Sequence, residues 1–101
     1  MNNELYLDVL RLAPTAENQS SLAEQLGFSV GKTHYVLNGL MEKGLIKAER
    51  FTRSNNKLAY RYVLTAKGIK ERIRLTEQFI QRKKQEYEAL QAELAVLKGD
   101  G

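Results

Sequence analysis

The chain has 101 residues, a formal net charge of +4, one histidine and no cysteine. The absence of cysteine excludes disulfides and thiolate chemistry, and a single histidine excludes a multi-histidine metal site. This length predicts one domain with a single modest core. No basic and apolar leader opens the chain and no apolar run approaches the ~20 residues of a membrane span, so we expect a cytoplasmic protein.

The positive charge is concentrated in the middle of the chain. Residues 29–74 carry 11 basic and 3 acidic side chains, a net charge of +8, whereas residues 1–28 and 75–101 have net charges of −3 and −1. A basic block of this kind indicates a polyanionic partner.

The first 44 residues predict three helices. The first covers about residues 3–13 and ends before Pro14, because proline disfavours helix at the preceding residue. A short second helix ends at Gly27, the residue type that best adopts the left-handed conformation. Ser29 is expected to cap a third helix that ends at Gly44 and buries an apolar stripe of Val30, Thr33, Leu37, Leu40 and Met41.

A β-hairpin and a long helix follow. The runs "LIKAERF" and "LAYRYVL" have strand composition, and "TRSNNK" between them supplies a turn with a basic tip. Leu58, Tyr60, Tyr62 and Leu64 should share one strand face, so we expect both tyrosines to pack. Thr65 then caps a helix that runs to Lys98, about 50 Å at ~1.5 Å per residue.

The last helix carries a heptad seam, in which steps of four and three alternate. Its members are Ile69, Ile73, Thr76, Ile80, Lys83, Tyr87, Leu90, Leu94 and Leu97. The seam favours a homodimer through a coiled coil, with Ile73, Ile80, Tyr87, Leu90, Leu94 and Leu97 as dimerisation residues. Thr76 and Lys83 weaken its middle, so parallel pairing, antiparallel pairing and packing on a partner's body all stay open. The expected organisation is a DNA-binding unit at 1–65, a dimerisation helix at 66–98 and a flexible tail at 99–101.

The second and third helices have the spacing of a helix-turn-helix. Only Gly27, Phe28 and Ser29 separate them, and Ala23, Gly27 and Val36 stand where such motifs place a small residue, a glycine and a branched apolar residue. With the basic hairpin behind it, the motif predicts a winged helix-turn-helix. The fold class is therefore mainly α (α+β), with a two-stranded wing and a long C-terminal coiled-coil helix.

The predicted function is sequence-specific binding of double-stranded DNA by a transcriptional regulator. A helical wheel places Gly31, Lys32, Tyr35, Asn38 and Gly39 opposite the buried stripe, where a helix at about 30–43 would meet the major groove. The wing at about 51–58 would meet the minor groove or the backbone. The candidate DNA-binding residues are Ser29, Gly31, Lys32, His34, Tyr35, Asn38, Arg53, Ser54, Asn55, Asn56 and Lys57. For His34, a local hydrogen-bonding role is as consistent with the sequence as a DNA contact.

Two other function classes are considered. Gly31-Lys32-Thr33 ends like a nucleotide-binding P-loop, but the required glycine five positions before Gly31 is Leu26. With no paired base and nucleophile and no metal cluster, we expect neither an enzyme nor a cofactor. The alternative is a protein-interaction module, with the winged helix as scaffold and the C-terminal helix as a partner-binding coiled coil.

The segment "SLAEQLGFSVGKTHYVLNGLMEKGLIKAERFTRSNNKLAYRYVLTAKGI" resembles the winged-helix core of the MarR family of bacterial transcriptional regulators. Including "ERIRLTEQFIQRKKQEYEAL", it is similar to the short MarR-type regulators associated with exopolysaccharide gene clusters. The resemblance implies a homodimer on a pseudo-palindromic operator, with Ser29, Lys32 and Tyr35 in the major groove and Arg53 to Lys57 as the wing. Larger family members build a dimer domain from both chain ends. This chain has one short helix and one long helix there, so an effector pocket is not implied.

Overall fold

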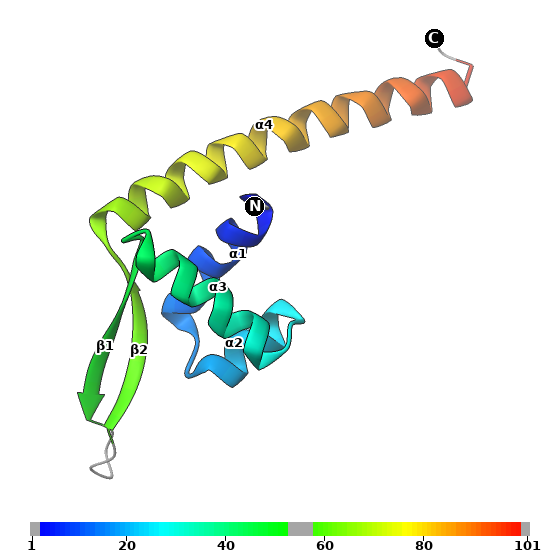
Figure 1. Cartoon of the computed structure of the whole chain (residues 1–101). Coiled ribbons are helices and arrows are strands. Elements are labelled where there is room, and N and C mark those ends of the chain that lie inside the picture. Colours follow the sequence, from blue (N-terminus) through cyan, green and yellow to red (C-terminus); the bar gives the residue numbers. More distant parts are fainter. Residues whose placement is uncertain (1–2, 53–57, 100–101) are drawn as a thin grey trace.

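The computed structural model describes residues 3–52 and 58–99, and the backbone alone at 51, 52, 58 and 59. The elements are α1 (Asn3–Leu12), a 3-10 turn (Ala13–Thr15), α2 (Gln19–Leu26), α3 (Val30–Glu42), β1 (Ile46–Thr52), β2 (Leu58–Leu64) and α4 (Ala66–Leu97). Figure 1 shows α1 lying between α4 and the α2–α3 pair, with the hairpin extending from the end at which α4 begins. The predicted winged helix-turn-helix architecture is confirmed.

The helix ends follow local chemistry that the sequence made visible. The side chains of Asn18, Ser29 and Thr65 accept backbone N–H groups in the first turns of α2, α3 and α4. Gly27 and Gly44 take φ values of 73° and 74°, which L side chains rarely adopt, directly after α2 and α3. These caps turn the chain sharply at both ends of α3, and so fix α3 against α2 and against the hairpin.

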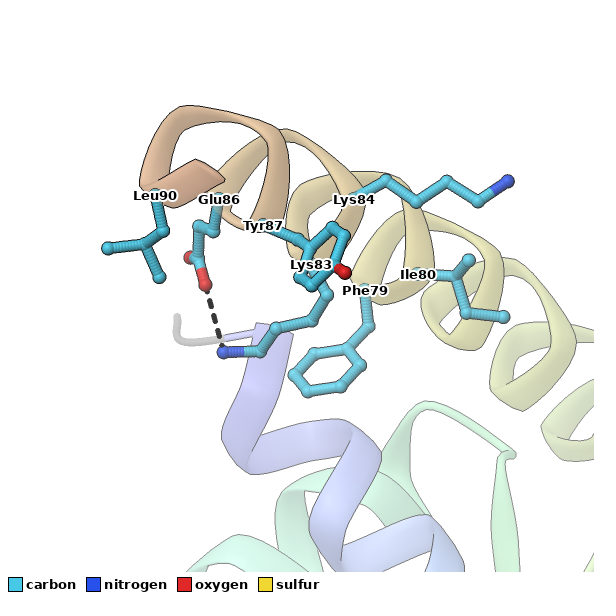
Figure 2. Close-up of a pocket in the computed structure, with 7 residues that line it drawn as sticks. All are labelled: Phe79, Ile80, Lys83, Lys84, Glu86, Tyr87 and Leu90. Atoms are coloured by element: carbon cyan, nitrogen blue, oxygen red, sulfur yellow. Dashed lines mark hydrogen bonds and ion pairs between the residues drawn. The ribbon is translucent and has the colours of Figure 1, made fainter. Parts of the chain in front are cut away.

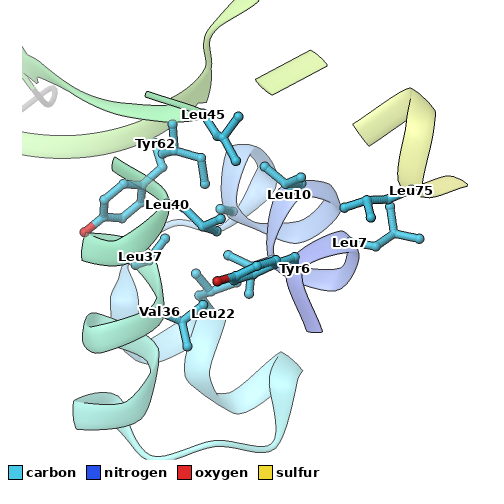
Figure 3. Close-up of a cluster of buried hydrophobic side chains, with 13 residues drawn as sticks. Tyr6, Leu7, Leu10, Leu22, Val36, Leu37, Leu40, Leu45, Tyr62 and Leu75 are labelled. Atoms are coloured by element: carbon cyan, nitrogen blue, oxygen red, sulfur yellow. The ribbon is translucent and has the colours of Figure 1, made fainter. Parts of the chain in front are cut away.

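The core joins all the helices and the inner end of the hairpin (Figure 3). α1 contributes Tyr6, Leu7, Val9 and Leu10, and α3 contributes Val36, Leu37 and Leu40. The predicted stripe of α3 is wrong at one position. Val30 is 48% exposed because it lies in the first turn beyond the core, and Val36 is buried instead.

The two strands pair antiparallel in the register Ile46↔Leu64 to Thr52↔Leu58. Tyr62 is buried at 7% exposure, but Tyr60, two residues nearer the turn, is 53% exposed. The expectation that both tyrosines pack is therefore wrong for Tyr60. A shared strand face is buried only as far as the core reaches, and Tyr60 instead accepts a 3.2 Å hydrogen bond from Nε of Arg50 on the paired strand.

The start of α4 is fixed to the end of α3. The hydroxyl of Thr65 donates to the carbonyl of Gly44 at 2.6 Å, and its N–H donates to the carbonyl of Leu45 at 3.1 Å. Gly68 brings the α4 backbone so close that an added Cβ would lie 1.9 Å from the Leu45 carbonyl oxygen. Leu75, further along α4, is buried in the core. Of the described helices, none is long and apolar enough to span a membrane.

Candidate nucleic-acid interface

The turn between α2 and α3 has the close approach that a helix-turn-helix requires. Ala23 on α2 is buried, and the N–H of Phe28 donates to its carbonyl at 2.9 Å. The stretch before Gly31-Lys32-Thr33 is a helix, whereas a P-loop follows a strand. Thr33 is buried and donates to the carbonyl of Ser29 at 2.9 Å, so its hydroxyl is committed to holding the first turn of α3.

The first two turns of α3 present the predicted recognition residues to solvent. Ser29, Gly31, Lys32 and His34 are exposed, and Tyr35 is 71% exposed. Nζ of Lys32 lies 4.0 Å from the ring centroid of Phe28, a cation–π contact that holds the ammonium group beside the turn. Gly31 has nothing within 4 Å of where a Cβ would be, so the backbone is open to close approach there.

The side chain of Ser29 forms the N-terminal cap of α3. Its Oγ accepts the N–H of Lys32 at 3.1 Å, which is the capping bond of α3. Phosphate groups bind well at helix N-termini, where free N–H groups and the helix dipole favour negative charge. The predicted DNA contact of Ser29 stays a prediction, and the cap is its observed role.

His34 and Asn38 belong to a hydrogen-bonded relay that the sequence did not reveal. Nε2 of Gln19, the first residue of α2, lies 3.2 Å from Nδ1 of His34 and donates to the hydroxyl of Tyr62 at 2.7 Å. Nδ2 of Asn38, which is half-buried, lies 3.0 Å from Nε2 of His34. The imidazole thus connects α2 and β2 to the outer face of α3. Gly39, the last residue of the predicted face, is half-buried.

The β1–β2 hairpin that bears the predicted wing carries charged side chains on both strands. Arg61 on β2 forms a 3.2 Å ion pair with Glu49 on β1, and Arg50 stacks with Tyr60. The predicted wing contacts at Arg53, Ser54, Asn55, Asn56 and Lys57 lie outside the described residues.

The basic block divides between two regions. Lys32, Arg50 and Arg61 lie on α3 and the wing, whereas other members surround the C-terminal end of α3 at its junction with α4. An open pocket of about 450 Å³ at this junction is lined by Asn3, Tyr6, Lys43, Leu45, Lys67, Glu71 and Arg74.

The charged side chains of this junction pocket form hydrogen bonds and an ion pair with their neighbours. Nζ of Lys67 donates to the carbonyl of Lys43 at 2.9 Å, and Nζ of Lys43 donates to the hydroxyl of Tyr6 at 3.0 Å. Glu71 pairs with Arg74, and the hydrogen bond and charge of Arg74, together with Lys43 and Lys67, lower the pKa of Glu71 below its ordinary 4.5. Lys67 therefore satisfies a carbonyl at the C-terminal end of α3, Lys43 bonds to α1, and Glu71 and Arg74 pair within α4, so these charges lie away from the N-terminal turns of α3.

The outer half of α4 presents an apolar surface. Ile73, Ile80, Tyr87, Leu90, Leu94 and Leu97 are all exposed, as is Ile69. Figure 2 shows a shallow pocket of about 530 Å³ on this helix, lined by Phe79, Ile80, Lys83, Lys84, Glu86, Tyr87 and Leu90. Lys83 is one of these lining residues, and its Nζ donates a hydrogen bond to Oε2 of Glu86 at 3.1 Å. Within the described ranges, no group of three or more acidic or histidine side chains is placed to hold a metal ion.

Comparisons place this fold among known regulators. No family model and no curated protein matches the chain. A PadR-like transcriptional regulator from Bacillus cereus superposes with a TM-score of 0.75 at 18% identity, covering 86% of this chain and 91% of that chain. A mutant of MepR from S. aureus, bound to an oligodeoxyribonucleotide, superposes with a TM-score of 0.62 at 21% identity, covering 99% and 78%.

A third similar structure is the PcaV transcriptional regulator from Streptomyces coelicolor, in complex with its natural ligand. Its TM-score is 0.63 at 16% identity, covering 100% of this chain and 76% of that chain. Likeness at these identities concerns the fold: the chain has the winged-helix fold that these transcriptional regulators share.

Proposed function

We propose that the protein is a double-stranded DNA-binding transcriptional regulator, with residues 30–43 in the major groove and the wing on the minor groove or the backbone. The observation that carries the proposal is the outer face of α3. Its residues Gly31, Lys32 and Tyr35 are exposed, the first three turns of α3 carry no acidic side chain, and the helix belongs to a helix-turn-helix held at both ends by caps. Winged-helix regulators of similar structure, one of them bound to an oligodeoxyribonucleotide, support this proposal. Its proposed location is the cytoplasm, where a bacterial chromosome lies.

The decisive experiment is in vitro selection of DNA followed by a salt titration of the selected operator and a scrambled duplex. Promoters of exopolysaccharide gene clusters are the first natural sequences to test, because of the resemblance described above. We expect tighter binding to the selected operator and an affinity that falls steeply with salt. Absence of binding, or equal and salt-insensitive binding to both duplexes, would overturn the proposal. Capture of a protein partner without DNA binding would favour the interaction-module alternative.

Lys32→Ala is the variant that tests the recognition helix. Removing one phosphate-neutralising ammonium should weaken binding and reduce the slope of log K against log salt by about 1. Lys70→Ala is the matched control, because Lys70 is also exposed but lies on α4. If both variants change the slope equally, the contact surface is not the outer face of α3.

We further propose that the regulator is a homodimer whose α4 helices run antiparallel. The C-terminal end of α3 and the inner end of the hairpin are both fixed at the start of α4, so the N-terminus of α3 and the outer end of the wing point away from α4. In a dimer, both units can meet the same face of DNA only if the two-fold axis points from α4 toward α3, and therefore lies perpendicular to the axis of α4 (Figure 1). A two-fold rotation about an axis perpendicular to a helix reverses the direction of that helix, so the two α4 helices run antiparallel.

Spin labels on α4 distinguish the arrangements. The chain has no cysteine, so single cysteines at Gln81, Glu88 and Ala92, which lie off the heptad seam, give one label per chain. In an antiparallel pair, the distance between identical labels should change by about 3 Å per residue moved, twice the helical rise. A distance that stays constant from position to position would contradict the antiparallel arrangement.

A further inference from the structure

The relay through His34 determines how Asn38 meets a ligand. A neutral imidazole carries one proton, so it donates at one ring nitrogen and accepts at the other. The NH2 group of Gln19 donates to the Tyr62 hydroxyl, and it also lies within hydrogen-bond distance of Nδ1 of His34. One NH2 group has two protons and serves both partners. With the Gln19 amide oriented as in the structure, Nδ1 accepts and Nε2 carries the proton. In the opposite orientation, the Gln19 oxygen accepts from the Tyr62 hydroxyl and from a protonated Nδ1, and Asn38 donates to Nε2, so the tautomer of His34 distinguishes the two networks.

This protonation fixes the amide of Asn38. An N–H group on Nε2 cannot form a hydrogen bond with an N–H group of Asn38, although 3.0 Å separates the two nitrogens. The oxygen and nitrogen of a terminal amide are equivalent in shape, and their assignment follows from their partners. The network therefore turns the oxygen of Asn38 toward His34 and its NH2 group outward.

We infer that His34 is a positioning residue that makes Asn38 a hydrogen-bond donor at the major groove. The inference rests on the proposed function. A free asparagine pairs with adenine through both its oxygen and its nitrogen, but here the oxygen is held by His34. Asn38 then prefers base edges that present acceptors, which guanine, adenine and thymine have. Cytosine, which presents its N4 donor in the major groove, is disfavoured as the base that Asn38 contacts.

The first test needs no DNA. The chain has one histidine, so 15N NMR of the labelled protein reports His34 alone. In the neutral imidazole, which the chemical shifts of the two ring nitrogens identify, we expect protonation at Nε2 and an unprotonated Nδ1. Protonation at Nδ1 would reverse the orientation of Asn38 and overturn the inference, whatever the protein binds.

The second test compares the base preferences of five proteins in the same in vitro selection: the wild type, His34→Ala, Asn38→Ala, the double variant of these two, and Gln25→Ala. His34→Ala frees both atoms of the Asn38 amide, so adenine should gain about fivefold over guanine at the position where the wild type disfavours cytosine, the effect of one hydrogen bond. Asn38→Ala should abolish the preference at that position, and His34→Ala should then have no further effect on it. Gln25→Ala, an exposed glutamine also on α2, should retain the wild-type preference.

The outcomes separate this inference from the function on which it rests. If the wild type selects a DNA sequence and His34→Ala selects the same one, the inference fails and the DNA-binding function stands. If His34→Ala changes base preference in the Asn38→Ala background, His34 acts by another route and the inference also fails. If the wild type selects no DNA, the proposed function fails.

Discussion

Gly68→Ala tests whether the close contact between α4 and Leu45, the residue before β1, holds the fold together. An ideal Cβ on Gly68 lies 1.9 Å from the carbonyl oxygen and 2.9 Å from the carbonyl carbon of Leu45, and both atoms are backbone. Contacts under 3.0 Å are essentially never formed, so the two segments must separate by roughly 1 Å. The carbonyl that has to move also accepts the N–H of Thr65, at the start of α4.

The expected cost follows from these contacts. Overpacking of this kind costs about 1–3 kcal/mol, and weakening one hydrogen bond adds about 1 kcal/mol. Replacing glycine by alanine inside a helix raises the free energy of unfolding by about 0.5–1 kcal/mol, which offsets part of this cost. The net loss of about 1–3 kcal/mol is a large part of the ~5–15 kcal/mol that stabilises a typical domain. Urea unfolding followed by circular dichroism, at one fixed protein concentration because a dimer couples stability to concentration, measures it.

Gly39→Ala is the matched control. Gly39 lies inside α3 and has nothing within 4 Å of an added Cβ, so the same substitution should stabilise the protein by about 0.5–1 kcal/mol. The two variants should therefore shift the urea midpoint in opposite directions. A Gly68→Ala protein as stable as the wild type, or shifted like Gly39→Ala, would refute the argument that backbone proximity selects glycine at this position.

Three further predictions concern α4. Thr65→Ala removes the α4 cap and the bond to the Gly44 carbonyl, and should lower the free energy of unfolding by about 1–2 kcal/mol in the same urea assay. Thr15→Ala, at an exposed threonine that loses only a local bond to the Leu12 carbonyl, should change it by less than about 0.5 kcal/mol. The pKa of Glu71 is lowered in the folded state, so ionised Glu71 contributes to the free energy of unfolding above its ordinary pKa of 4.5, and this contribution is lost as pH falls through the folded-state pKa. Glu71→Gln should therefore show a smaller fall in Tm than the wild type between about pH 5 and pH 3. An unchanged dependence of Tm on pH would contradict this. Leu94→Glu should shift sedimentation toward monomer while Val96→Glu, exposed but off the seam, should not, and equal behaviour of the two would count against pairing through the seam.

The parts of the fold that the sequence predicted are those that depend on near neighbours in the chain. Ser29 and Thr65 cap helices because a hydroxyl three residues before an N–H group needs no distant partner. Gly27 and Gly44 end helices through their own backbone freedom. These features define the three turns of the winged helix, and so its class was predictable.

The errors and omissions depend on distant residues. Tyr60 shares a strand face with Tyr62, and only the position of the core shows that one is buried and the other exposed. Gln19 and Tyr62 are 43 positions apart, so their bond was not visible in the sequence. The same holds for Gly68, whose role depends on the approach of the Leu45 backbone, 23 positions earlier in the chain. A glycine in the first turn of a helix, directly after the strand, was the only signal available.

The heptad seam and the core-facing side of α4 are different faces, and this lets one helix serve two purposes. Leu75 is buried and Phe79 packs partly against the core, whereas Ile73 and Ile80 are exposed. At 100° per residue, the second pair lies about 130° around the helix from the first. Ile73 and Ile80, the seam residues beside the chain's own body, therefore do not belong to the face that covers it. Beyond Phe79 the helix passes the end of α1 (Figure 1), and apart from Val96 its large exposed apolar residues are those of the seam. The heptad spacing of the apolar residues continues along this part of α4, although no part of the described chain covers it. Pairing with the α4 helix of a second copy would bury these residues, and the proposed dimer is therefore placed at α4.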